Sequence, residues 1–268
     1  MPELPEAEYM VRRLAECAGG AVIERVKVLR ASAVAPQTAR YLARHARGAV
    51  SGYSRRAKNV LVHLESGWTI RVRLGMTGHV YPITAAKEAP RFTRVSLELA
   101  GGGAIVFEDA RTLGGVAVHD AGELEGVLSG YGPEPLAPGF RWQDLQGRAD
   151  GLSLAVKQFL LDPSRVAGLG NIWAAESLFR AGVHPERRVR DMDEEEWRRL
   201  HAAIRRTLAG AIENTFRVTT GPEEFPEADL LRLSVYGREG EPCRKCRRPV
   251  QRKVQAGRSS YFCPGCQR

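Results

Sequence analysis

The sequence predicts an α+β protein: an N-terminal helix with a β-sandwich, then a helical domain, then a small C-terminal segment organised by cysteines. Three observations support this fold class. Apolar and polar residues alternate in several short stretches up to about residue 120, which is typical of strands. Beyond about residue 150 the apolar spacing becomes helical, and four of the five cysteines lie from residue 243 onward.

Size and composition limit the class of protein. The chain has 268 residues, of which 43% are hydrophobic, enough for two modest domains with proper cores and a small appendage. It contains no run of apolar residues long enough to span a membrane, and its charged start does not resemble a signal peptide. We therefore expect a cytoplasmic monomer without a membrane partner.

The first helix is predicted from Glu6 to Ala18, where apolar residues recur at helical spacing until Gly19-Gly20 ends the pattern. Pro5 suits the first turn of such a helix. Period-two stretches follow and predict the short strands of a β-sandwich or barrel. These strands are expected around 22–28, 60–64, 68–74, 95–99, 104–107 and 116–118.

A segment rich in glycine and proline, from Gly130 to Gly139, predicts a linker between two domains. Short helices are predicted beyond it over 154–161 and 171–180, and a long amphipathic helix follows the N-cap residue Asp193. The predicted boundaries are a sandwich domain over 1–125, a linker over 126–150, a helical domain over 151–230 and a C-terminal segment over 231–268.

Four cysteines near the C-terminus have the spacing of a metal site. Two residues separate Cys243 from Cys246 and Cys263 from Cys266, and sixteen lie between the pairs. This pattern predicts one structural zinc ion in tetrahedral coordination, with two disulfides as the alternative. The segment has too little core to fold alone, so the metal would supply much of its stability. Cys17 is expected to be a buried or half-buried hydrophobe.

Positive charge is concentrated at the C-terminus. The whole chain carries a net charge of +9, and the segment from Arg232 to Arg268 holds ten Lys/Arg and two acids, a local balance of +8. A terminal segment with such an excess of positive charge predicts a polyanionic partner, most commonly nucleic-acid phosphate.

The N-terminal residues predict a nucleophilic amine. Removal of Met1 would leave Pro2 as a secondary amine, and an α-amino group titrates near pH ~8, so a useful fraction is neutral at working pH. Attack of this amine on a sugar or carbonyl carbon gives an iminium ion, and Glu3 is placed to move protons beside it. Lys58 is the second candidate for the nucleophile.

Four sequence features occur together in one order along the chain. On these motifs the chain resembles the formamidopyrimidine-DNA glycosylase / endonuclease VIII family of base-excision repair enzymes over essentially its whole length. The form of the first motif is closer to the formamidopyrimidine-DNA glycosylase branch. The motifs are Met1-Pro2-Glu3-Leu4-Pro5-Glu6, Lys58-Asn59, Gly168-Leu169-Gly170-Asn171-Ile172 and the four-cysteine site ending Tyr261-Phe262-Cys263-Pro264-Gly265-Cys266-Gln267.

The resemblance implies a bifunctional DNA glycosylase and abasic-site lyase acting at the bacterial nucleoid. Its partner would be double-stranded DNA with an oxidised base, foremost 8-oxoguanine or a formamidopyrimidine, or with an abasic site. Pro2 would attack C1′ of an extruded nucleotide, Glu3 would protonate the deoxyribose ring oxygen, and Glu6 would help to arrange the site. Successive β- and δ-eliminations would then remove the sugar.

The resemblance also implies residues that hold the DNA. Lys58 would lie on phosphate near the lesion. Lys157 and Asn171 belong to the implied helix–two-turn–helix element, where Asn171 would hold a phosphate. Arg258, on the hairpin between the two cysteine pairs, would grip phosphates around the extruded nucleotide.

Insertion into the duplex is the last role implied, and here the chain departs from the family's pattern. Met76, Arg111 and Leu113 match positions that fill the hole left by the extruded nucleotide. Leu113 and Ala110 stand where Phe and Pro are typical, and the segment 214–222 lacks the Gly-Gly-Thr-Thr-Leu-Arg-Asp run that closes over an oxidised purine. The alternatives are an endonuclease VIII-like glycosylase for oxidised pyrimidines, a non-catalytic damaged-DNA-binding protein and a lyase active only on abasic sites.

Overall fold

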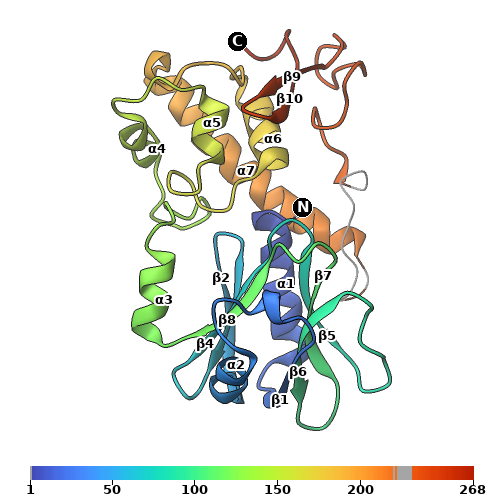
Figure 1. Cartoon of the computed structure of the whole chain (residues 1–268). Coiled ribbons are helices and arrows are strands. Elements are labelled where there is room, and N and C mark those ends of the chain that lie inside the picture. The colour runs from blue at the N-terminus through green and yellow to red at the C-terminus, as the bar shows by residue number, and fades with distance from the viewer. Residues whose placement is uncertain (1, 220, 222–230) are drawn as a thin grey trace. The chain divides into compact units, whose positions relative to one another are not determined.

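The computed structural model of the chain, shown in Figure 1, describes residues 2–219, 221 and 231–268. These residues form two compact units, the first made of 2–129 with 215–219 and 221, the second of 130–214 with 231–268. The fold has the mixed α+β character that the sequence predicts. Within the described ranges, no helix has both the length and the hydropathy needed to cross a membrane.

The first unit combines one buried helix with eight strands. Helix α1 (Leu4–Ala18) begins two residues before the predicted start, because Leu4 and Pro5 fit its first turn. A 3₁₀ turn at Ala31–Ala33 and helices α2 (Ala39–His45) and α3 (Ala121–Leu128) complete the unit. The strands are β1 (Val22–Val28), β2 (Gly48–Arg56), β3 (Asn59–Leu64), β4 (Thr69–Arg73), β5 (Gly78–Ile83), β6 (Thr93–Leu99), β7 (Ala104–Asp109) and β8 (Gly115–His119).

The eight strands run in the order β5-β7-β6-β1-β2-β3-β4-β8, and every neighbouring pair is antiparallel. Only two residue pairs join β1 to β2, so the strands divide into two four-stranded halves. Both halves and α1 bury apolar side chains in one core, and Figure 1 shows α1 between them. Helix α1 contributes Ala7, Met10, Val11 and Leu14 to this core.

Two strands were not predicted, for different physical reasons. Strand β5 is at the edge of the sheet and contains Pro82, which has no N–H to donate and is tolerated at an edge. Strand β2 is half-buried along most of its length and does not alternate between apolar and polar residues. In contrast, the six predicted strands are confirmed, because one face of each lies against the core.

The second unit is helical, with a small hairpin near the C-terminus. Helix α4 lies inside the range 126–150 predicted as a linker, so part of that range is ordered as a helix. The helices are α4 (Trp142–Ala149), α5 (Val156–Leu161), α6 (Asn171–Ala181) and α7 (Glu194–Val218), with a 3₁₀ turn at Val189–Asp191. The hairpin is formed by β9 (Gln251–Gln255) and β10 (Arg258–Phe262).

The ends of α6 and α7 follow the predicted signals. Gly182 ends α6 in the left-handed conformation, with φ of 74°. The Asp193 carboxylate accepts a hydrogen bond from the Glu196 N–H at 2.7 Å, which confirms Asp193 as the N-cap of α7. Helix α7 continues through Val218, so the first five residues of the segment 214–222 are helical; residues 220 and 222 lie outside the described residues.

A buried carboxylate fastens the C-terminal segment to α6. Glu176, only 7% exposed, accepts backbone N–H bonds from Ser234, Val235 and Tyr236 at 2.9–3.0 Å. Three charge-assisted bonds to one buried carboxylate are strong and directional. They attach the chain just before the first cysteine pair to the helix that begins at Asn171.

Candidate functional site

The start of α1 holds the candidate catalytic residues in a fixed geometry. Glu3 and Glu6 form a capping box in which the Glu3 N–H donates to Glu6 Oε2 at 2.8 Å. The Glu3 side chain is fully buried, and Pro2 is buried beside it. The nitrogen of Pro2 is part of the Met1–Pro2 peptide bond in this chain, so nucleophilic chemistry there requires removal of Met1.

Arg55 ties α1 to the turn that carries Lys58. Its guanidinium contacts Glu8 Oε2 of α1 at 3.1 Å and donates to the Ala57 carbonyl at 2.9 Å. Lys58 lies in the two-residue turn between β2 and β3, directly before the first residue of β3, and Ala57 beside it has a φ of 53°. The tertiary structure therefore links the second candidate amine to the helix that begins at Glu3.

Met76, Arg111 and Leu113 are exposed on two loops of the first unit. Met76 lies between β4 and β5, whereas Arg111 and Leu113 lie between β7 and β8. The loops touch, since a Cβ atom on Gly75 would lie 2.6 Å from the Gly114 nitrogen. Met76 and Leu113 are 40% and 42% exposed, so both apolar side chains are accessible to a partner.

Lys157 and Asn171, in the second unit, converge on one carbonyl of the hairpin. Lys157 Nζ donates to the Ser259 carbonyl at 2.8 Å and to Ser260 Oγ at 2.7 Å, and Asn171 Nδ2 donates to the same carbonyl at 3.0 Å. Ser259 follows Arg258, the exposed first residue of β10. Helices α5 and α6 thus hold the strand that carries Arg258.

The burial of Lys157 changes what its ammonium can do. The residue is only 1% exposed, so its charge is directed at the hairpin rather than at solvent. Asn171 is 8% exposed, and no hydrogen-bond partner of its Oδ1 lies among the described residues. Lys157, which was expected among the residues that hold the DNA, therefore has a geometry suited to positioning Arg258.

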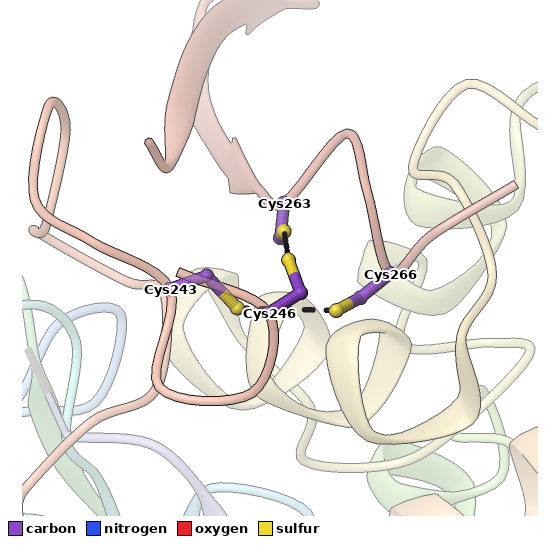
Figure 2. A group of neighbouring side chains, drawn as sticks. All are labelled: Cys243, Cys246, Cys263 and Cys266. Atoms are coloured by element: carbon purple, nitrogen blue, oxygen red, sulfur yellow. Dashed lines mark hydrogen bonds between the residues drawn. The ribbon is translucent and has the colours of Figure 1, made fainter. Parts of the chain in front are cut away.

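The four C-terminal cysteines converge, as Figure 2 shows. Their sulfur atoms all lie within 4.8 Å of one another; Cys243 and Cys266 are 3.9 Å apart, and Cys246 and Cys263 are 3.3 Å apart. A tetrahedral zinc ion with Zn–S bonds of about 2.3 Å needs sulfurs about 3.8 Å apart. The cluster therefore has the donor set and spacing of one structural zinc ion.

The acid–base properties of the cluster also fit a bound cation. Burial opposes ionisation of Cys243, but backbone N–H groups pointing at its sulfur lower its pKa to about 7. Burial and the neighbouring thiols raise the pKa of Cys266 to about 12. All four thiols ionise together only when a divalent ion compensates their charge. Cys17 lies outside the cluster and is exposed, so its expected burial is wrong.

Several residues of these sites carry no signal in the sequence. Arg55, Glu176 and Ser259 resemble any other arginine, glutamate or serine along the chain. Their roles depend on partners far away in sequence: Lys157 and Ser259, for example, are 102 positions apart. Only the folded chain brings such groups together.

Comparisons with known proteins agree with the fold and with the four-cysteine site. Three family models match in order: the formamidopyrimidine-DNA glycosylase N-terminal domain over 1–116, the formamidopyrimidine-DNA glycosylase H2TH domain over 131–220, and a zinc finger found in FPG and IleRS over 240–268. The chain belongs to the formamidopyrimidine-DNA glycosylase family.

Individual relatives cover the full chain. Formamidopyrimidine-DNA glycosylases of Novosphingobium aromaticivorans and Burkholderia cenocepacia are 40% and 38% identical, with complete coverage of both chains. The Thermus thermophilus MutM (FPG) structure is 36% identical, with a TM-score of 0.86 over 99% of this chain and 98% of its own. A Lactococcus lactis FPG variant in complex with DNA containing Fapy-dG is 27% identical, with a TM-score of 0.91 and full coverage of both chains.

Proposed function

We propose that this chain removes oxidised bases from duplex DNA and cleaves the strand at the resulting abasic site, with Pro2 as the nucleophile. The glycosylase and lyase class follows from the family. The observation that carries the residue assignment is the capping box, which holds the buried Glu3 next to Pro2 at the start of α1. The Lactococcus lactis relative has been captured with both Fapy-dG and abasic-site DNA.

The proposed chemistry uses one amine and one carboxyl group. The nitrogen of Pro2 forms a bond to C1′ of the extruded nucleotide and gives up its N–H proton, while the bond from C1′ to the base breaks and the base leaves after taking up a proton. Glu3 donates a proton to the ring oxygen as the sugar opens, which leaves an iminium ion between Pro2 and C1′. The iminium withdraws electrons from the neighbouring C–H bond, so β-elimination and then δ-elimination of the phosphates follow. The side chain of Glu6 holds Glu3 in position by accepting a hydrogen bond from the backbone N–H of Glu3.

The remaining assignments divide between the two units. In the first, Lys58 lies on phosphate near the lesion, and Met76, Arg111 and Leu113 fill the hole in the duplex. In the second, Arg258 grips phosphates and the zinc ion on the four cysteines holds the finger that carries it. The bacterial relatives support a cytoplasmic location at the nucleoid.

A panel of duplexes tests this function. Oligonucleotides with 8-oxoguanine, formamidopyrimidine, thymine glycol or an abasic site are incubated with the enzyme and borohydride, and covalent complexes are counted. We expect trapping on the abasic site and on at least the formamidopyrimidine duplex. Trapping on the abasic site alone would indicate a simple lyase, and no trapping on any duplex would exclude the enzyme assignment.

Oxidised pyrimidines are the second candidate substrate class. Leu113 is a smaller wedge than the aromatic residue typical of the family, and one Lactococcus lactis FPG structure contains DNA with an oxidised pyrimidine. Faster release of thymine glycol than of 8-oxoguanine in the same panel would select this candidate.

The salt dependence of DNA binding distinguishes a phosphate contact from a positioning role. Arg258→Ala is expected to reduce the slope of log K against log salt concentration by about one, because one phosphate contact is lost. Lys157→Met is expected to weaken binding without changing that slope, since the buried ammonium acts through Ser259. Fluorescence anisotropy at several salt concentrations measures both values. A slope reduced equally in Lys157→Met would mean that Lys157 contacts phosphate directly.

A further inference from the structure

Asp109, the last residue of β7, joins the two loops that carry the candidate insertion residues. Its side chain is fully buried. The hydroxyl of Thr77, next to Met76, donates to Asp109 Oδ1 at 2.5 Å. The backbone N–H of Arg111 donates to the same oxygen at 3.2 Å, and that of Gly114 donates to Oδ2 at 2.7 Å. One carboxylate therefore holds both loops.

The carbonyl groups of the second loop are also held, by two arginines. Arg94 donates to the Asp109 carbonyl at 2.7 Å and to the Ala110 carbonyl at 3.1 Å. Arg73 donates to the Leu113 carbonyl at 3.0 Å. Although this loop is exposed, most of its backbone polar groups already have protein partners, which is unusual for a surface loop without a regular structure.

The backbone conformation of this loop is strained. Thr112, between Arg111 and Leu113, has a φ of 53°, a conformation that β-branched residues rarely adopt. Such strain persists only where the surroundings impose it, and it is concentrated at functional sites. The hydrogen bonds to Asp109 supply that constraint on both sides of Thr112.

Asp109 remains charged at neutral pH. Burial alone would raise its pKa, but hydrogen bonds from the Thr77 hydroxyl and from the loop N–H groups outweigh burial and lower the pKa. A charged acceptor makes shorter and stronger bonds than a neutral one. The carboxylate therefore holds the two loops throughout the physiological pH range.

We propose that Asp109 and Thr77 form a positioning clamp that pre-organises both loops, so that Met76, Arg111 and Leu113 enter the duplex as one rigid wedge. This inference rests on the insertion role given to those residues under the proposed function. Without the clamp, the two loops would have to become ordered during insertion, and the entropy lost would slow nucleotide extrusion. Asp109 and Thr77 act through the wedge and touch no DNA themselves.

Thr77→Val tests the clamp, because it keeps the side-chain shape and removes the hydroxyl that bridges the loops. Two DNA substrates are compared. The first is a duplex with 8-oxoguanine and 2-aminopurine as its neighbour, where fluorescence reports insertion. The second is a duplex with an abasic site opposite a one-nucleotide gap. Extrusion of the sugar from this duplex leaves no space in the base stack that the insertion residues must fill. We expect the insertion rate on the first to fall about tenfold or more, and borohydride trapping on the second to change less than about twofold.

Two further variants control for general damage to the fold. Thr77→Ser restores the hydroxyl and should recover the insertion rate. Thr69→Val removes a different threonine hydroxyl of the same unit, one that lies 3.1 Å from His63 Nδ1. The insertion rate of this variant should equal that of the wild type. Unchanged insertion in Thr77→Val, or an equal loss on both substrates, would overturn the clamp. If the wild-type protein formed no covalent complex with either substrate, the assignment of Pro2 as the nucleophile would be wrong. The fluorescence change would still decide whether Thr77 controls insertion.

Discussion

Pro2→Gly is expected to lower the rate of borohydride trapping on an abasic duplex by about 100-fold or more. Two properties of the nucleophile are lost. The ring no longer restricts the orientation of the nitrogen, and a primary amine forms an imine that must gain a proton before it withdraws electrons as an iminium does. Single-turnover trapping resolved by gel electrophoresis measures the rate. Mass analysis of the N-terminus must first show that Met1 is absent from both proteins.

Pro5→Ala is the matched control for this substitution. Pro5 occupies the first turn of α1, where alanine is also favoured, so this variant should trap like the wild type. Undiminished trapping by Pro2→Gly would point to Lys58 as the amine. Lys58→Gln would then abolish the covalent complex.

Cys246→Ser is expected to remove the zinc ion and to weaken DNA binding by about 100-fold or more, because metal binding supplies the folding free energy of such a small segment. The hairpin that carries Arg258 depends on this segment, since Cys263 directly follows β10. Metal content is measured by atomic absorption and affinity by anisotropy. Chelation of the wild-type protein should reproduce the loss of affinity.

Cys17→Ser distinguishes loss of a ligand from loss of any thiol. Cys17 is exposed on α1 and lies outside the four-cysteine cluster, so this variant should keep one zinc ion and full affinity. Retention of one zinc ion and wild-type affinity by Cys246→Ser would refute the zinc site.

The elements predicted from the sequence are those whose pattern is local. Strand β8 alternates because Val116 and Val118 face the core while Ala117 between them is less buried, and α6 ends where Gly182 permits the left-handed conformation. Strand β2 lacks this alternation, and β5 contains a proline tolerated only at the sheet edge. These two segments are recognised as strands only from their pairing with neighbouring strands, and that pairing is not encoded in the local sequence.

The sites divide in the same way. The zinc ligands are predictable because two short cysteine knuckles encode them by spacing alone, and the family relationship was visible in contiguous motifs such as the one that begins at Pro2. The role of Lys157 was not predictable, because its partners Ser259 and Ser260 lie about a hundred residues away. The same holds for Asp109, which joins loops separated by three strands along the chain.

Composition and periodicity thus sufficed for the α+β class and cysteine spacing for the zinc ligands, while resemblance to known motifs pointed to the family. Folding settled which polar groups face the solvent and which are buried as supports, as with the ammonium of Lys157 and the carboxylate of Asp109. The physical reason is that burial and hydrogen-bond partners arise from long-range packing, and a charged side chain has the same letter in the sequence whether it contacts water or a distant carbonyl.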